Sequence, residues 1–279
     1  MRAPERSNQY ALGSAAAEHE RLIRQANWLA PHTERLFREA GIGPGQRVLD
    51  LGCGVGDVSL ILARLVGPSG QVVGIDREPR SIARARARAA ENGLTNTSFT
   101  QSDVSALPPA DLFDAAVGRY ILLFLPDPVY VLRSLSRLLR AGGVLAFQEP
   151  DWELFLTACE RAPLWRAAAA LMVETFRRSG TNTEMGVALA GAFERAGLPT
   201  PTTHSDVLVG AERWMPDVLH SLRPNIQALE LPLAALGDFA TLWERLQAEA
   251  SARMNAIPLP SLVSAWARIP AAADGLRTG

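Results

Sequence analysis

The chain has 279 residues, of which 48% are hydrophobic and 20% charged, and its formal net charge is −1. These values are typical of a globular protein with enough residues for one large core. A net charge so close to zero gives no long-range attraction to nucleic acid or to an anionic membrane, so neither is an expected partner. The two cysteines lie far apart, and no Cys or His spacing is typical of a zinc site, so no metal is expected.

No segment has the pattern of a membrane span or of a signal peptide. The longest fully apolar run covers residues 167–173, far fewer than the roughly 20 residues that a spanning helix needs. The first ten residues are polar and contain no apolar stretch. We therefore expect a cytoplasmic protein.

The first half of the chain alternates between predicted helices and strands. Residues 18–40 carry apolar residues at helical spacing, and Pro31 is expected to break this helix. Short apolar strands then alternate with helices, which is typical of a parallel sheet covered on both faces. The predicted strands cover residues 47–51, 71–76, 97–101, 113–119 and 143–149, and the predicted helices 58–65, 79–91 and 129–139.

The second half is predicted to be mostly helical. Helices are expected over residues 163–178, 184–196, 216–231 and 238–255, and strands over 205–209 and 259–267. No repeat and no second core is evident, so we expect one domain over residues 1–279. It would consist of an N-terminal helical lid (1–40), a cofactor-binding core (41–150), and cap helices with the last two strands (151–279).

The motif Val48-Leu-Asp-Leu-Gly-Cys-Gly-Val-Gly-Asp57 carries the strongest functional signal. A strand runs into a glycine loop and then into a helix, an arrangement that lets the backbone approach a ligand closely. The dinucleotide fingerprint G-x-G-x-x-G would need glycine at position 57, where the chain has Asp57.

Acidic residues on both sides of this loop indicate which cofactor it binds. Asp50 and Asp57 would repel a pyrophosphate but would attract a cofactor with an ammonium and a sulfonium group. S-adenosylmethionine has these charges and no phosphate. A nicotinamide-dependent oxidoreductase is disfavoured and remains the alternative.

Two further strands end in acidic residues. Asp76 follows the second strand, where a carboxylate can accept hydrogen bonds from both ribose hydroxyls. Asp103 follows the third strand, where it could accept from the adenine amine while the Val104 N–H donates to the ring. Acids at the ends of three successive strands predict an S-adenosylmethionine site.

These motifs resemble those of the class I S-adenosylmethionine-dependent methyltransferases, in particular the UbiE-like bacterial small-molecule group. The matching segments are residues 48–56, Gly74-Ile-Asp76, Asp103-Val104, residues 113–119 and Arg140-Ala-Gly-Gly143. The resemblance implies a doubly wound α/β, Rossmann-like sheet of seven strands in the order 3-2-1-4-5-7-6, with the seventh strand antiparallel. It assigns cofactor roles to Asp50, Gly52, Gly54, Asp76, Asp103 and Val104, to which we add the neighbouring Cys53, Gly56 and Arg77.

Three further residues are also predicted to contact the cofactor. Arg119 leaves the fourth strand where the methionine carboxylate should lie, although Glu149 or Asp50 is an alternative ion-pair partner. In similar methyltransferases an N-terminal segment folds over the cofactor, so Tyr10 and Gln25 are expected to close the site. The alternative is a helix that only packs on the sheet edge.

The reaction implied is an in-line methyl transfer to a small hydrophobic or aromatic metabolite. A general base is needed only if the acceptor must lose a proton. The residues that could serve are Glu149, Asp151 and the four histidines His19, His32, His204 and His220, and we select Glu149 and His204 as the candidate bases. The aromatic residues after position 150 would form an apolar acceptor pocket. Binding of S-adenosylmethionine without methyl transfer, by a cyclase or a regulatory protein, is a second alternative, and a homodimer is one option for assembly.

A stripe of arginines at helical spacing is given no function. Arg80, Arg84 and Arg88 are expected to form a solvated helix face.

Overall fold

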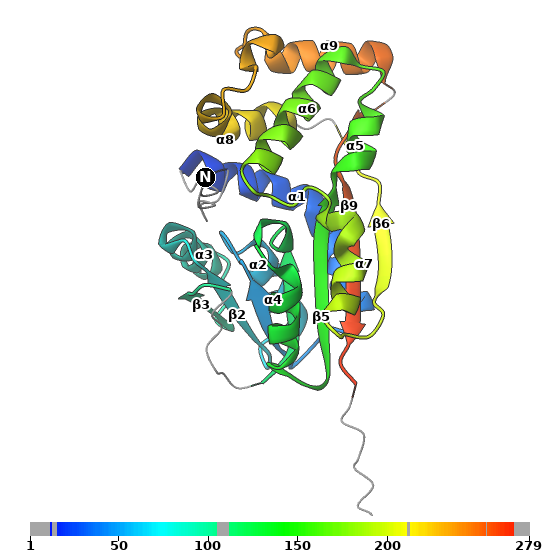
Figure 1. The fold of residues 1–279 in the computed structure, drawn as a ribbon. Coiled ribbons are helices and arrows are strands. Elements are labelled where there is room, and N and C mark those ends of the chain that lie inside the picture. The colour runs from blue at the N-terminus through cyan, green and yellow to red at the C-terminus, as the bar shows by residue number, and fades with distance from the viewer. Residues whose placement is uncertain (1–11, 13–15, 105–111, 211–212, 255, 271–279) are drawn as a thin grey trace, which may run out of the picture.

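The computed structural model describes residues 12, 16–104, 112–210, 213–254 and 256–270. Its central feature is a seven-stranded sheet in the order β3-β2-β1-β4-β5-β9-β6 (Figure 1). Its strands are β1 (Arg47–Leu51), β2 (Gln71–Asp76), β3 (Thr97–Gln101), β4 (Phe113–Arg119), β5 (Leu139–Asp151), β6 (Thr202–Asp206) and β9 (Ser261–Arg268). Strands β1 to β5 pair in parallel, and β9 runs antiparallel to its neighbours β5 and β6. The predicted strand order and the antiparallel seventh strand are therefore confirmed.

Helices cover both faces of the sheet. Successive residues of a strand point to opposite faces, and in the central strands the residues on both faces are apolar and need to be buried. Val48 packs with α1 (Ala16–Glu39) and α2 (Asp57–Val66), whereas the next residue, Leu49, packs with α4 (Pro128–Ser136) and α7 (Met185–Arg195). Helix α3 (Pro79–Glu91) packs on β2 and β3. The central strands are thus buried on both faces.

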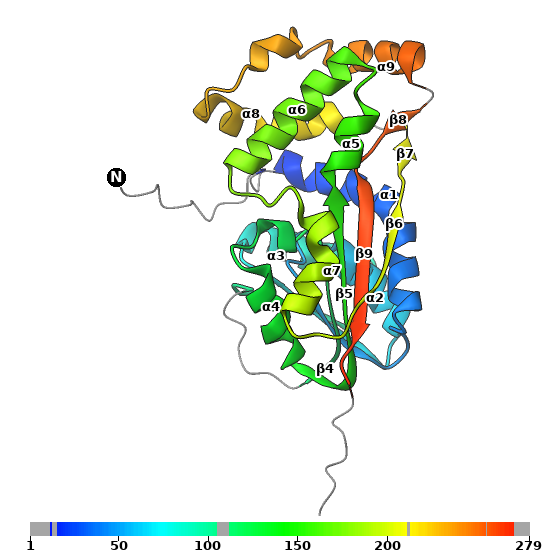
Figure 2. The same ribbon diagram turned by 45° about the vertical axis from the view of Figure 1, so that its right-hand side comes forward.

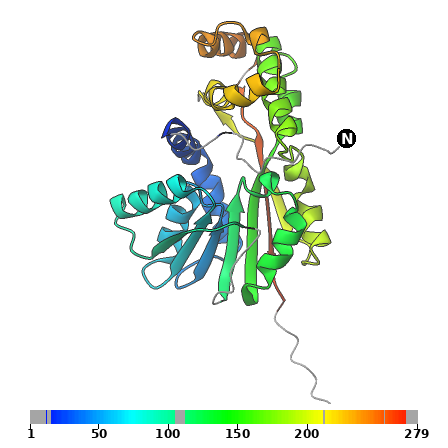
Figure 3. The ribbon, with the colours of Figure 1, turned by 60° about the vertical axis from the view of Figure 1, so that its left-hand side comes forward.

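Helix α1 runs through Pro31 without interruption, so the expected break there is wrong. A proline fixes φ near the helical value and removes one N–H donor, and a helix with other contacts along its length tolerates that loss. Leu29 belongs to the apolar cluster of the cap, while Leu36 and Phe37 pack on the sheet. Helix α1 therefore links the cap to the sheet, and Figure 3 shows it between them.

The cap is a group of helices beyond the carboxyl ends of the parallel strands (Figure 1). It comprises α5 (Trp152–Ala158), α6 (Pro163–Arg178), α8 (Trp214–Ala228), α9 (Leu242–Arg253) and the 3-10 helix η2 (Leu233–Leu236). These helices share an apolar cluster separate from those on the sheet, which the sequence pattern did not indicate. Trp165 is fully buried in it, and its Nε1 donates to the Leu246 carbonyl at 2.8 Å.

Strands β5 and β9 connect the sheet to the cap. The pairing of β4 with β5 ends at Gln148, but β9 continues to pair with β5 as far as Asp151. Figure 2 shows both strands reaching the cap, beside the short ribbon of β7 (Val209–Gly210) and β8 (Ile257–Pro258). No helix within the described residues is long and apolar enough to cross a membrane.

Candidate functional site

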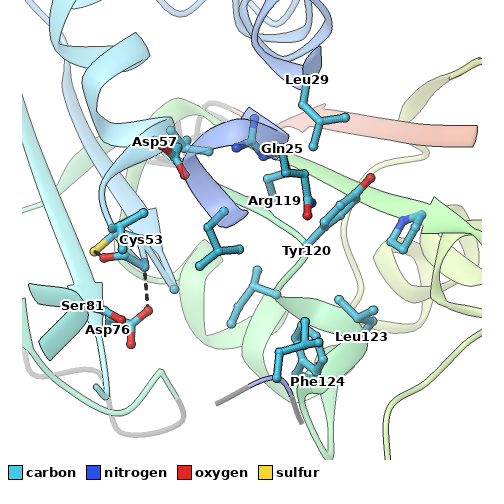
Figure 4. Close-up of a pocket in the computed structure, with 18 of the residues that line it drawn as sticks. Gln25, Leu29, Cys53, Asp57, Asp76, Ser81, Arg119, Tyr120, Leu123 and Phe124 are labelled. Atoms are coloured by element: carbon cyan, nitrogen blue, oxygen red, sulfur yellow. Dashed lines mark hydrogen bonds between the residues drawn. The ribbon is translucent and has the colours of Figure 1, made fainter. Parts of the chain in front are cut away.

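A cavity of about 830 Å³ lies at the carboxyl edge of the parallel strands. Its walls come from the glycine loop after β1, the ends of β2 and β4, the segments after β3 and β4, the first half of α1, the first turn of α4 and the cap. Figure 4 shows part of this lining, with acidic residues on one side and apolar side chains on the other. Open α/β sheets bind their ligands at this edge. We call the part near the glycine loop the acidic end and the part under the cap the apolar end.

Gly52 and Gly54 both adopt left-handed backbone angles, with φ of 65° and 52°, but their surroundings differ. A Cβ at Gly52 would lie 2.5 Å from Ile121 Cδ1. A Cβ at Gly54 would meet nothing within 4 Å, and both glycines line the cavity. Gly52 is thus required by packing, whereas Gly54 leaves space for a ligand.

The Asp76 carboxylate lies at the acidic end and also fixes the loop. It accepts hydrogen bonds from the Gly54 and Glu78 N–H groups, both at 2.9 Å. Burial raises the pKa of Asp76, and these two backbone bonds act in the opposite direction. Each carboxylate oxygen has two lone pairs, so Asp76 retains acceptor capacity toward hydroxyl groups in the cavity.

Asp50 and Gly56 do not line the cavity. Asp50 is buried beneath the loop and accepts a hydrogen bond from Ser59 Oγ. Burial raises the pKa of Asp50 to about 7. At Gly56, with φ of 89°, a Cβ would lie 3.1 Å from the Ala85 Cβ. The geometry gives both residues a role in shaping the loop.

The expectation that Arg88 belongs to a solvated helix face is wrong. Its guanidinium forms a salt bridge of 2.6 Å with Asp57 and donates to the Val55 carbonyl at 2.7 Å, so it holds the glycine loop against α3. Because Arg88 balances the Asp57 charge, Asp57 opposes a pyrophosphate less strongly than the sequence indicated.

Arg119 lines the cavity and donates through Nη1 to Thr33 Oγ1 at 3.0 Å. Burial lowers its pKa. Neither Asp50 nor Glu149, nor any other described carboxylate, lies within salt-bridge distance of its guanidinium. Its positive charge is therefore available to an anion in the cavity.

The other predicted cofactor residues also line the cavity, except one that falls outside the described residues. Tyr10 is the exception, and the residues in the lining are Gln25, Cys53, Arg77, Asp103 and Val104. Burial raises the pKa of Cys53, so it stays a neutral thiol. Of the four histidines considered as bases, His19 lines the cavity, and its Nε2 lies 3.3 Å from the Oγ of Ser81, a lining residue that sequence reasoning missed.

Glu149 does not line the cavity, although it was a candidate base. Its Oε1 accepts from the N–H groups of Ile121 and Leu122, at 3.2 and 2.8 Å, at the start of the 3-10 helix η1 (Leu122–Phe124). Burial raises the pKa of Glu149 to about 8. A neutral carboxyl that holds a turn is a positioning group and is poorly placed to take a proton.

His204, the other candidate base, lies outside the cavity on the edge strand β6. Its ring packs against Trp266 at 5.5 Å, and its Nε2 lies 3.2 Å from Arg35 Nη2. An edge strand opposite β3 cannot present a side chain to the glycine loop, so the geometry removes His204 from the site.

The apolar end is lined by aromatic and aliphatic side chains from α1 and the cap. They are Trp28, Leu29, Trp152, Phe176, Leu208, Trp214, Val218 and Leu259. Of the aromatic residues expected here, Trp165 and Phe155 instead lie inside the cap cluster. One cavity thus contains both the acidic end and the apolar end.

Comparison with known proteins agrees with this geometry. A family model described as a methyltransferase domain matches residues 42–192. The chain is 37% identical over 141 residues to aklanonic acid methyltransferase DauC of Streptomyces sp. (strain C5), which covers 50% of the chain and 63% of that protein. It is 46% identical over 103 residues to a 2-phytyl-1,4-naphtoquinone methyltransferase of Synechococcus elongatus, which covers 36% and 44%. The chain thus spans less than two thirds of the length of these relatives.

Solved structures share the fold at low identity. An S-adenosylmethionine-dependent methyltransferase from Aquifex aeolicus has a TM-score of 0.50 and 18% identity, over 85% of this chain and 89% of that one. The [4+2]-cyclase SpnF has a TM-score of 0.51 and 22% identity, over 86% and 80%. The fold therefore occurs in both methyltransferases and a cyclase, but the family model covers more than half of the sequence. On that match, the chain belongs to the methyltransferase domain family.

Proposed function

We propose that the protein transfers the methyl group of S-adenosylmethionine to a small, apolar or aromatic acceptor. The observation that carries this proposal is one cavity with an acidic end at the glycine loop and an apolar end under the cap. A cationic cofactor fits the first, and an uncharged ring system fits the second. The relatives named above act on aklanonic acid and on a phytyl naphthoquinone, which supports an acceptor of this kind.

The residues at the acidic end suit S-adenosylmethionine. Asp76 would offer acceptor atoms to ribose hydroxyls, Asp103 and Val104 line the cavity and would contact the adenine, and Gly54 leaves space beside the backbone. Arg119 supplies a cation for the methionine carboxylate. When bound, S-adenosylmethionine supplies a methyl group already activated by the sulfonium.

The protein's contribution to the reaction would be to position the acceptor and exclude water. The apolar side chains of α1 and the cap would hold the acceptor ring beside the acidic end and keep the cavity dry. Arg21, in the same wall, is ion-paired to Glu18 at 2.6 Å, and Ser221 of α8 donates to Glu18 at 2.7 Å. These bonds join α1 to the cap and support the proposed role of α1 as a lid.

The experiment is calorimetric titration with S-adenosylmethionine, S-adenosylhomocysteine and NADH, followed by a screen of apolar acceptors for release of S-adenosylhomocysteine. We expect binding of the first two ligands and no binding of NADH. Asp76→Asn should weaken S-adenosylhomocysteine binding about 5- to 100-fold, because ribose hydroxyls lose a charged acceptor. The matched control is Asp238→Asn, at an exposed residue before α9 whose carboxylate accepts only from the Ala240 N–H among described groups.

Preferential binding of NADH would instead support an oxidoreductase. Binding of S-adenosylmethionine with no release of S-adenosylhomocysteine from any acceptor would support the cyclase or regulatory alternative. Sedimentation of the same samples tests the homodimer.

A further inference from the structure

We propose that the Tyr120 hydroxyl donates a hydrogen bond to an oxygen atom of the methyl acceptor, at the junction between the acidic and apolar ends of the cavity. This inference rests on the proposed function and narrows it. The acceptors it admits are ring systems that carry a carbonyl, ether or phenolic oxygen.

The backbone of Tyr120 is held in an unusual conformation directly after β4. Its φ of 56° lies in the left-handed region, which costs a tyrosine about 1–2 kcal/mol. Three hydrogen bonds impose this turn: Tyr120 N donates to the Gln148 carbonyl at 2.9 Å, and the next two N–H groups donate to Glu149 Oε1. Strain kept in place by buried partners is typical of a functional position.

The side chain of Ile121 locks the same turn from the other side. A Cβ at Gly118 would lie 2.6 Å from Ile121 Cγ2, and a Cβ at Gly52 would lie 2.5 Å from its Cδ1. The Ile121 side chain thus fills the space between β4 and the glycine loop. This space exists because Gly52 and Gly118 have no Cβ. The turn links the position of Tyr120 to that of the loop.

The ring of Tyr120 extends into the cavity, as Figure 4 shows. It packs against the apolar cluster of the cap and against that of the sheet face covered by α4 and α7. Tyr120 therefore stands where the cofactor-binding core and the acceptor-binding cap meet. A group at this junction can contact an acceptor placed beside the methyl donor.

The Tyr120 hydroxyl is a hydrogen-bond donor beside the apolar end. The Tyr120 hydroxyl has no hydrogen-bond partner among the described residues, and burial raises its pKa, so it remains protonated. The indole Nε1 atoms of Trp152 and Trp214 also lack partners within the described chain, but both atoms are buried in the cap and do not face the cavity. The described cap residues add no carboxylate to the lining. A donor with no acceptor of its own suits an oxygen atom of the ligand and disfavours an ammonium group.

The test compares two ring systems that differ by one oxygen, 2-naphthol and naphthalene, as probes of the apolar end. Their Kd values are measured by equilibrium dialysis against the full chain saturated with S-adenosylhomocysteine. We expect the wild type to bind 2-naphthol about tenfold more tightly than naphthalene, as one buried hydrogen bond provides. Tyr120→Phe keeps the ring and should remove this preference, with unchanged affinity for naphthalene and for S-adenosylhomocysteine.

Ile121→Ala provides a second variant, because it loosens the turn without removing the hydroxyl. We expect it to reduce the preference for 2-naphthol partially. The proposal is overturned if Tyr120→Phe retains the full preference, or if the wild type binds both probes equally. Failure of the wild type to bind S-adenosylhomocysteine in the parallel titration would instead contradict the proposed function.

Discussion

Gly52 and Gly54 are separated by one residue, yet their substitution should have different effects. Gly52→Ala places a methyl group against Ile121, so we expect a loss of stability larger than the about 1 kcal/mol that left-handed strain alone costs. Gly54→Ala meets only that strain, but its methyl group enters the cavity.

Thermal unfolding and calorimetry of the two variants distinguish these effects. Gly52→Ala should lower Tm more, and Gly54→Ala should weaken S-adenosylhomocysteine binding more. If the two variants have the same Tm and the same loss of affinity for S-adenosylhomocysteine, the different roles assigned to Gly52 and Gly54 are wrong.

Glu149 should make the folded state less stable as the pH rises. Its pKa is raised from 4.5 to about 8 on folding, so between these values the folded protein holds a proton that the unfolded chain has released. The contribution of Glu149 to the free energy of unfolding is therefore greatest below about pH 4.5. It falls by up to about 1.4 kcal/mol per pH unit until about pH 8. Urea unfolding of the wild type and Glu149→Gln between pH 5 and 8 tests this.

Glutamine mimics the neutral acid, so the Glu149→Gln curve should fall less steeply with pH than that of the wild type. Asp50, whose pKa is raised to about 7, contributes in the same direction in both proteins and leaves a residual slope. Parallel curves would show that Glu149 is ionised in the folded state.

At the scale of elements, α5 and α8 place Trp152 and Trp214 at the roof of the cavity. Replacing either with alanine should raise the KM of the acceptor about tenfold or more, because a large apolar contact is lost, with little change in cofactor affinity. Trp243→Ala on α9 is the matched control, since Trp243 belongs to the cap but does not line the cavity. The roof assignment fails if all three variants change the KM equally.

The elements of the parallel half could be predicted closely from the sequence, because glycine, proline and asparagine residues mark many of their boundaries. The helix over residues 79–91 and the strands over 71–76, 97–101 and 113–119 have the predicted bounds. Helix α5 was missed because it follows β5 without a loop, with Asp151 as its N-cap. The separate core of the cap was missed because apolar periodicity does not say which helices pack together.

The site was predictable where the strand ends determine it. Asp76 and Asp103 follow strands whose carboxyl ends meet at one edge, so their approach to the glycine loop follows from topology. The Arg88 contact depends on how α3 is rotated, and the Tyr120 turn depends on a left-handed backbone angle. Neither feature can be predicted from the residue types alone. The position of Tyr120 directly after β4 could, however, have indicated that this residue lies at the site.

At the scale of the whole molecule, the cavity lies between three parts of the chain, namely α1, the edge of the sheet and the cap. A ligand that fills both ends contacts α1, the sheet edge and the cap together. This explains why no single segment of the sequence contains the site.

The continuous pairing of β5 with β9 has a consequence for how the protein unfolds. Eight successive paired positions, from Val144 with Arg268 to Asp151 with Ser261, run without a break from the sheet into the base of the cap. Opening the cap would require this ladder to break within a buried strand, so the cap and the sheet should share one cooperative unfolding unit. In a hydrogen-exchange experiment, the amides of α6 and of β4 should then show similar free energies of opening. A calorimetric scan should give a single unfolding transition.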